Sequence, residues 1–167
     1  MLLFFLLSVA LVAADQITKA LAVTYLKPLT TVPIIEDFLH LTFRENSGAA
    51  FSILDGFRWG FVVLAIVVCG VMIYINITKK VESKLFYTAS ILVVSGAAGN
   101  VIDRIATGAV VDFIDFRVIN FPVFNFADIC LTVGVALLFV YVLFFYGKDK
   151  TPEKKGAVPD DTDSHNR

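Results

Sequence analysis

Charged residues are scarce in this chain of 167 residues, at 17% of the total, and the net charge of -1 leaves no excess of either sign. The basic residues are scattered, so the sequence lacks the basic stripe with which proteins bind a nucleic-acid backbone. Hydrophobic residues make up 57% of the chain, and its mean hydropathy of +0.79 is far above that of a soluble domain. These proportions exclude a nucleic-acid partner and indicate a membrane protein.

Histidine is also rare, and the motifs of several known enzyme classes are missing. His40, in an outer loop, and His165, in the C-terminal tail, are the only histidines, and no H-E-x-x-H motif is present, so a zinc protease site is not expected. The glycine patterns that bind phosphates or dinucleotides are absent. So are the G-x-S-G of rhomboid-like serine proteases and the G-x-G-D of presenilin-type proteases. We therefore expect neither a metal nor another cofactor.

The two cysteines, Cys69 and Cys130, both lie in apolar runs. The topology derived below places Cys69 near the middle of the bilayer and Cys130 near its outer face. At 1.5 Å per residue this is a difference in depth of roughly 10–15 Å. That separation is too large for a disulfide, so both thiols are expected to be free and to pack as small hydrophobic groups.

Four apolar runs reach the roughly 20 residues that a helix needs to span a bilayer. The expected spans are residues 2–26, 57–78, 85–105 and 127–146. Lys79, Lys80 and Lys84 cluster between the second and third spans, and four more lysines follow the fourth. The positive-inside rule therefore places both segments, and with them both termini, in the cytoplasm. We expect an all-α integral membrane protein with its two longer connections outside.

The two ends of the chain need separate interpretation. Residues 148–167 are charged and polar, which predicts a disordered cytoplasmic tail after a membrane domain of residues 1–147. Residues 2–14 also resemble a signal peptide, with a cleavage site at Val12-Ala13-Ala14. No positive charge precedes this run, and its removal would leave three spans, so we favour a retained first span.

The outer connections contain short β patterns. Residues 38–44 alternate with period two and are followed by Glu45-Asn46-Ser47-Gly48, which indicates a strand that ends in a turn. Residues 110–118 also suit an extended chain. We therefore expect a small β platform on the outer surface, and Asp115 within it is interpreted as a solvated loop charge.

Carboxylates and amides from distant parts of the chain gather in the outer part of the predicted bundle. They are Asp15, Asn100, Asp103, Asp112, Asn125 and Asp128. Polar groups in an apolar setting must pair with one another, so one shared site is favoured over several independent features.

Each of these residues also has an ordinary structural explanation. Asp15 and Lys19 could form an i, i+4 ion pair whose lysine extends outward to the membrane surface. Asp103 and Arg104 could anchor the end of a helix at the interface, and Asp112 could be an ordinary loop charge. Asp128 could be a first-turn acid favoured by the helix dipole, with Asn125 as the helix cap, or itself the cap.

Two carboxylates are enough to hydrolyse a peptide bond without a covalent intermediate. One, ionised, takes a proton from water, while the other, protonated, donates a hydrogen bond to the scissile carbonyl. Asp112 and Asp128 are the candidates, because a loop residue and a residue at a helix start can converge at the surface, where water is available.

Two other classes of function remain open at this point. In an ion-coupled transporter, Asp15, Asp103 and Asp128 would line an ion path. Such a path should continue inward, yet the inner halves of the spans contain little that is polar beyond Asn76 and Thr78. A noncatalytic membrane scaffold would need no pair of aspartates at all.

Five short motifs, in order along the four spans, carry a resemblance to a known family. They are Asp15-Gln16-Ile17-Thr18-Lys19, Asn46-Ser47-Gly48-Ala49-Ala50-Phe51, Gly99-Asn100-Val101-Ile102-Asp103-Arg104, Val110-Val111-Asp112-Phe113 and Phe124-Asn125-Phe126-Ala127-Asp128. Each motif alone is weak, but the five together are highly specific. Over approximately residues 10–140 the chain resembles the lipoprotein signal peptidases, or type II signal peptidases, of bacteria. Ile129-Cys130 departs from that family, where serine is common.

The resemblance implies specific roles for the polar residues. Asp112 and Asp128 would be the catalytic aspartates. The residues that support the site or contact substrate and inhibitor would be Asp15, Lys19, Asn46, Gly48, Asn100, Asp103, Arg104 and Asn125. Gly48 would permit close backbone approach, and the platform that carries Asn46 could close over the site as a lid.

The resemblance also implies the partners and the location. The substrate would be a prolipoprotein whose cysteine already carries diacylglycerol, cleaved just before that cysteine, and globomycin would inhibit the enzyme. The protein would lie among the lipids of the bacterial cytoplasmic membrane, with its active site toward the outer face.

Overall fold

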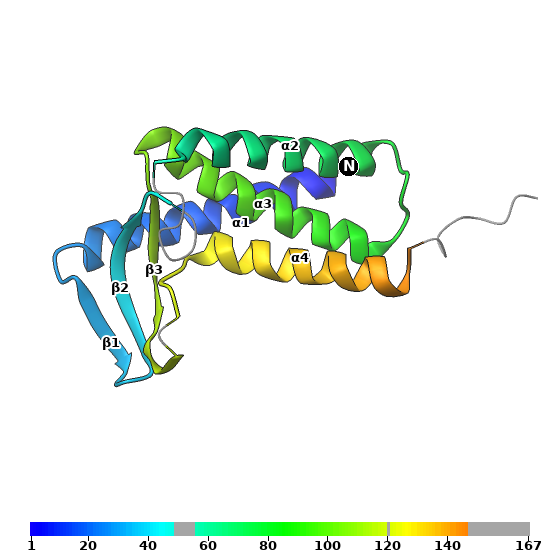
Figure 1. The fold of residues 1–167 in the computed structure, drawn as a ribbon. Coiled ribbons are helices and arrows are strands. Elements are labelled where there is room, and N and C mark those ends of the chain that lie inside the picture. Colours follow the sequence, from blue (N-terminus) through cyan, green and yellow to red (C-terminus); the bar gives the residue numbers. More distant parts are fainter. Residues whose placement is uncertain (49–55, 120, 147–167) are drawn as a thin grey trace, which may run out of the picture.

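The computed structural model describes residues 1–48, 56–119 and 121–146 (Figure 1). Within these ranges, four helices are long and apolar enough to cross a membrane. They are α1 (Leu2–Leu21), which continues as the π-helical segment η1 (Ala22–Leu26), α2 (Arg58–Ile77), α3 (Lys84–Ala106) and α4 (Phe126–Phe144). The predicted spans agree with these bounds to within two residues, and the predicted four-helix membrane fold is confirmed.

The central helix of the bundle is α3, which packs against α1, α2 and α4 (Figure 1). Its small residues allow this close packing, because they let helix backbones approach one another in a membrane. A Cβ added at Gly96 would overlap the carbonyl oxygen of Ala127 in α4. A Cβ added to Gly134 of α4 would lie 2.9 Å from the backbone nitrogen of Val93. Glycine on both helices therefore sets the contact between α3 and α4.

The start of α1 is a packed part of the bundle. Phe4 is fully buried in a core cluster with Ile91 and Val94 of α3. Figure 1 shows the start of α1 and the end of α4 at the same end of the bundle, opposite the sheet. The free thiols of Cys69 and Cys130 are confirmed, although Cys69 is only half-buried.

A three-stranded antiparallel sheet crosses the other end of the bundle (Figure 1). Its strands, in spatial order, are β1 (Thr31–Ile35), β2 (Leu39–Asn46) and β3 (Val110–Phe116). A short 3-10 turn, η3 (Arg117–Ile119), follows β3. An isolated bridge between Ile114 and Phe124 ties β3 to the chain that leads into α4. The sheet thereby holds β3 against the start of α4.

The sheet corrects several details of the predicted platform. Strand β2 does not end before Glu45 but runs through Asn46, because both residues pair with β3. A bulge between Leu41 and Arg44 interrupts the alternation that predicted the strand. The extended chain ends at Phe116, not at residue 118. Strand β1 was not predicted, because proline is tolerated in a sheet only at special places such as an edge strand, where Pro33 lies.

Two polar residues of the platform are more enclosed than expected. His40 lies on β2, not in a loop, and is buried; neither ring nitrogen has a hydrogen-bond partner in the part of the chain that the structure describes. Asp115 lies on β3 and is not a solvated loop charge, since its side chain is 13% exposed and accepts a 2.7 Å hydrogen bond from the hydroxyl of Thr42. The proposed tail of residues 148–167 lies outside the described residues, as do residues 49–55, which follow the platform strand that was expected to act as a lid.

Candidate active site

Lys19 of α1 is the centre of a buried ion cluster between α1 and α3. Its Nζ lies 2.9 Å from Asp15 Oδ2 and 2.9 Å from Asp103 Oδ2, and it donates a 2.9 Å hydrogen bond to Asn100 Oδ1. The residue is 3% exposed, so an outward-extending lysine is the wrong picture. Lys19 points inward because three acceptors there match the three donors of its ammonium group.

Asp15 joins α1 to the other two helices that form the site. Its Oδ1 accepts a 3.0 Å hydrogen bond from the backbone nitrogen of Ala127, in the first turn of α4, where the helix dipole favours a negative group. Gly99 of α3 leaves the space for this carboxylate, because a Cβ there would overlap Asp15 Oδ2. The fit of these three helices therefore depends on one buried aspartate.

Asp103 connects α3 to the sheet and is not an exposed helix anchor. It is 8% exposed, and its Oδ2 accepts a 3.2 Å hydrogen bond from the backbone nitrogen of Val111 in β3. Since the same oxygen pairs with Lys19, the buried ion cluster also fixes the height of β3 on the bundle. Asp112 is the next residue of β3, so it is held at the same height on the bundle.

Asn125 and Asp128 cap the start of α4 reciprocally. Asn125 Oδ1 accepts a 3.0 Å hydrogen bond from the backbone nitrogen of Asp128, and Asp128 Oδ2 accepts a 3.1 Å hydrogen bond from the backbone nitrogen of Asn125. This capping box satisfies donors that the helix start leaves open. Asn125 is thus the cap and Asp128 the first-turn acid, as one of the ordinary explanations expected.

The same two side chains also take part in a second network, which links them to Asp112. Asn125 Nδ2 donates to Asp112 Oδ1 at 2.6 Å and to Asn100 Oδ1 at 3.2 Å. Asn100 Nδ2 in turn donates to Asp128 Oδ1 at 2.8 Å. Two amides therefore connect the carboxylates of Asp112 and Asp128, and a purely structural cap does not explain this arrangement.

Asp112 is buried on strand β3, within the segment that was predicted to be extended, so the explanation as an ordinary loop charge is wrong. Its Oδ2 accepts a 3.0 Å hydrogen bond from Asn46 Nδ2 of β2. Burial raises the pKa of this carboxyl to about 6, and the negative charge of Asp128 acts in the same direction, while the amides of Asn46 and Asn125 oppose the shift. Asp112 is consequently suited to hold a proton that an exposed aspartate would release.

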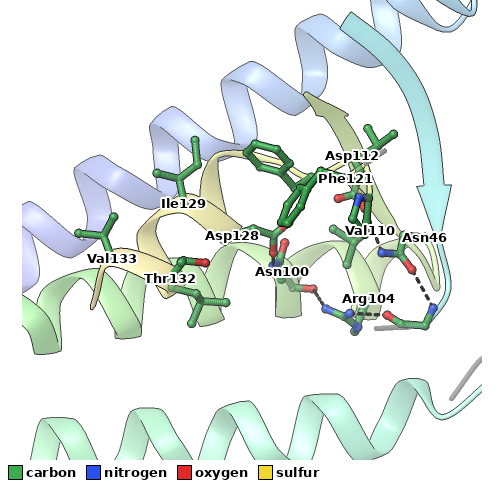
Figure 2. A pocket seen from close by; sticks show the side chains of 15 residues that line it. Asn46, Asn100, Arg104, Val110, Asp112, Phe121, Asp128, Ile129, Thr132 and Val133 are labelled. Atoms are coloured by element: carbon green, nitrogen blue, oxygen red, sulfur yellow. Dashed lines mark hydrogen bonds between the residues drawn. The ribbon is translucent and has the colours of Figure 1, made fainter. Parts of the chain in front are cut away.

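A cavity of about 560 Å³ brings the two aspartates together (Figure 2). Figure 2 shows Asp112 and Asn46 at one end, Asn100 near the middle, and Ile129 and Val133 of α4 toward the other end. The further lining is Gly48, Arg104, Val110, Phe121, Pro122, Val123, Phe124, Asp128, Leu131 and Thr132. The cavity is therefore an apolar groove along α4 that ends in a cluster of acids and amides.

Arg104 and Gly48 support the polar end of this cavity. Arg104 donates to the carbonyl oxygen of Gly48 at 3.0 Å and to that of Asn100 at 3.3 Å, and its guanidinium lies over the ring of Phe61. The backbone nitrogen of Gly48 donates to Asn46 Oδ1 at 3.0 Å. This bond orients the amide of Asn46 so that its nitrogen faces Asp112. The backbone nitrogen and the carbonyl oxygen of Gly48 thus both form hydrogen bonds with side chains of the site.

Some residues of the site were not predicted from the sequence. Gln16 Nε2 donates to Asp15, to Asp103 and to the carbonyl oxygen of Gly99. Its place beside Asp15 in the first motif was the available signal. Residues 121–124 form an apolar wall of the cavity, and apolar side chains in an outer connection could have indicated them. Among the described residues, no three side chains of histidine, cysteine, aspartate or glutamate are grouped so that they could hold a metal ion.

Comparisons with known proteins place this architecture in a family. The model of the signal peptidase (SPase) II family matches residues 7–144. A lipoprotein signal peptidase of Clostridioides difficile is 41% identical over 89% of this chain and all of its own length. One from Symbiobacterium thermophilum is 45% identical over 94% of this chain and all of its own length.

Solved structures agree with this match. A bacterial membrane enzyme determined by the in meso method at 2.3 Å resolution superposes with a TM-score of 0.79 and is 36% identical, covering 95% of both chains. The relatives are peptidases, so neither the transporter nor the scaffold has support. The chain is a multi-pass bacterial membrane peptidase, and it belongs to the signal peptidase II family.

Proposed function

We propose that this protein cleaves the signal peptide from diacylglyceryl-modified prolipoproteins, just before the lipidated cysteine, with Asp112 and Asp128 as an aspartic catalytic pair. The observation that carries this proposal is that both carboxylates line the polar end of one apolar cavity and are joined there by two amides. Membership of the signal peptidase II family supports the class of substrate.

In this mechanism a water molecule bound between the two carboxylates is the nucleophile. One carboxylate, ionised, takes a proton from the water as its oxygen attacks the scissile carbonyl carbon. The other carboxyl of the pair holds the shared proton and donates a hydrogen bond to the carbonyl oxygen, which becomes an oxyanion; the raised pKa of Asp112 favours such sharing of a proton. Collapse of the tetrahedral intermediate breaks the C–N bond, and the leaving nitrogen of the cysteine receives a proton from the pair.

The amides hold both acids in place during these steps. Asn46 and Asn125 each donate to Asp112, and Asn100 donates to Asp128. Lys19 fixes Asn100 in turn, because its ammonium group can only donate and therefore requires the oxygen of that amide on its side. The nitrogen of Asn100 must then face Asp128, which keeps a donor on the carboxylate.

The shape of the cavity suits a lipidated peptide. Its apolar wall, which includes Phe121, Phe124, Ile129 and Val133, can accommodate apolar chains beside the acids. A diacylglyceryl group is confined to a leaflet, so acids at the same depth reach the bond next to the cysteine without extraction of the lipid. Globomycin would inhibit by occupying this cavity, and membrane lipids would lie beside it.

The orientation in the membrane follows from charge. Lys79 and Lys80 lie at the end of the bundle opposite the sheet, between α2 and α3, and the positive-inside rule places that end in the cytoplasm. Both termini would then be cytoplasmic, and the cavity would face the outer leaflet.

A cleavage assay with matched precursors tests the function. The purified full chain, in detergent or lipid nanodiscs, is expected to cleave a diacylglyceryl-modified precursor and to leave the same precursor with an unmodified cysteine intact. Mass spectrometry of the product should place the cut just before the cysteine. Cleavage should persist in a metal chelator and stop with globomycin. Equal cleavage of both precursors would reject lipid recognition, and loss of activity in the chelator would reject a mechanism based on the aspartates alone.

The raised pKa of Asp112 predicts a dependence of stability on pH. The folded protein keeps a proton that the unfolded chain, with a value near 3.8, has released. The contribution of this carboxyl to stability is therefore complete below about pH 4 and is lost as the pH rises through about 6. Melting temperatures measured from pH 4 to 8 should show this decline for wild type and lack it in Asp112→Asn. Identical profiles for the two proteins would contradict the shift.

A further inference from the structure

A second cavity, of about 530 Å³, adjoins the first one on the β platform. The two cavities share Asn46, Asp112, Phe121, Pro122 and Val123. The other residues that line the second cavity are all polar, namely Thr42, Arg44, Glu45, Asp115 and Arg117. An apolar cavity and a polar one therefore meet at Asp112.

We propose that this polar cavity binds the first residues of the mature lipoprotein, those that follow the lipidated cysteine, and that Arg44 favours acidic side chains among them. The inference rests on the proposed function, because it takes Asp112 to act at the scissile bond. A precursor bound at Asp112 has two apolar parts, the signal peptide before the scissile bond and the acyl chains on the cysteine after it, and one polar part, the mature chain that follows the cysteine. The two cavities that meet there differ in the same way.

The sheet register brings Arg44 within reach of the substrate. Arg44 of β2 lies directly opposite Asp112 of β3 in the ladder. Cα atoms of directly opposed residues in an antiparallel pair are about 4.5–5.5 Å apart. An extended substrate advances about 3.3 Å per residue. A mature chain that leaves Asp112 through the polar cavity therefore passes Arg44 within its first few residues.

The charges around the polar cavity single out Arg44. Glu45 is paired with Lys27 at 3.0 Å, and Asp115 is paired with Arg117 at 3.1 Å. The guanidinium of Arg44 has no hydrogen-bond or ion-pair partner among the residues that the structure describes. Arg44 is exposed and has no paired acid among the described residues, so its guanidinium group provides a positive charge beside the substrate path.

Charge reversal on both sides of this contact tests the proposal. Three lipidated precursors are compared that carry Glu, Gln or Lys at the third mature residue, counting the cysteine as the first. They are assayed with the full chain in nanodiscs of zwitterionic lipid. For wild type, we expect KM to rise in the order Glu, Gln, Lys, by about three- to tenfold in all, a span that suits an exposed ion pair. The kcat value should change little, because the contact exists before and during the chemical step.

The variant Arg44→Glu should reverse this order, so that the Lys precursor has the lowest KM. Lys80→Glu, which makes the same change in net charge in the connection between α2 and α3, is the matched control and should keep the wild-type order. An acidic lipid phosphate could also meet Arg44, so the assay is repeated with anionic lipid. A preference that follows the lipid charge and not the precursor charge would overturn the proposal.

Failure of this inference is distinguishable from failure of the proposed function. If wild type cleaves all three precursors with the same KM, or if Arg44→Glu keeps the wild-type order, the subsite is rejected and the peptidase function stands. If wild type cleaves no lipidated precursor, the proposed function itself is rejected, and the subsite with it.

Discussion

Asp112→Asn and Asp128→Asn are each expected to abolish cleavage of a lipidated precursor, with kcat/KM lower by on the order of 10³-fold or more. Asparagine keeps the size of the side chain but cannot take a proton from water or supply one to the leaving group. Each carboxylate also accepts hydrogen bonds from amide nitrogens, and one of its two oxygens would be replaced by an amide group. The measurement is single-turnover cleavage of a labelled precursor.

Two controls make this experiment decisive. Asp37→Asn makes the same chemical change on the platform at a residue that lines neither cavity. Its positive φ of 57° is one that asparagine tolerates, so cleavage should stay near the wild-type rate. Melting temperatures of all variants establish that they are folded. A folded Asp112→Asn or Asp128→Asn variant that cleaves at the wild-type rate would show that the pair is not catalytic.

Lys19→Met is expected to lower the free energy of unfolding by about 3–5 kcal/mol, the usual cost of removing one partner of a buried ion pair. Methionine matches the length of the lysine stem but leaves Asp15 and Asp103 without their cation. It also removes the donor that orients Asn100, so activity should fall in the fraction that folds. Denaturant titration in mixed micelles measures the loss of stability, and the cleavage assay measures the activity.

Lys27→Met is the matched control for this second prediction. Lys27 also pairs with a carboxylate, Glu45, but both side chains are 55% exposed. Exposed ion pairs contribute between 0 and about 1 kcal/mol, so this variant should unfold close to wild type. If Lys19→Met is as stable as Lys27→Met, the buried cluster does not hold the bundle together.

The sequence predicted those features of this protein that depend on the length of an apolar run and on where a residue lies within it. Membrane spans depend on the length of an apolar run, and the depth of Asp15, Asn100 and Asp128 follows from their positions within the spans. This was enough to expect a shared polar site. Hydropathy does not determine the direction of a side chain, however. Lys19 could extend to the surface or point inward, and only the positions of its three acceptors decide between them.

The platform was harder to predict, because its strands pair over long distances in the sequence. Asp112 is held in the sheet by the pairing of β3 with β2, where it lies opposite Arg44. All of α2 and α3 separate these two residues in the sequence. The bulge in β2 and the proline in β1 both weaken the local pattern. The polar cavity that these strands form could not be foreseen, since it requires the register as well as the strands.

The hydrogen bond from Ala127 to Asp15 can form only late in biosynthesis, after the fourth span has been made. It joins the first span to the last, and Asp128 lies in the same turn of α4 as Ala127. During synthesis, a nascent chain with three spans inserted contains Asp15, Lys19 and Asn100 but lacks Asp128 and the cap that faces Asp112. With Asp128 in the proposed catalytic pair, proteolytic competence would arise only when the fourth span has docked, so an unfinished chain could not cut its neighbours.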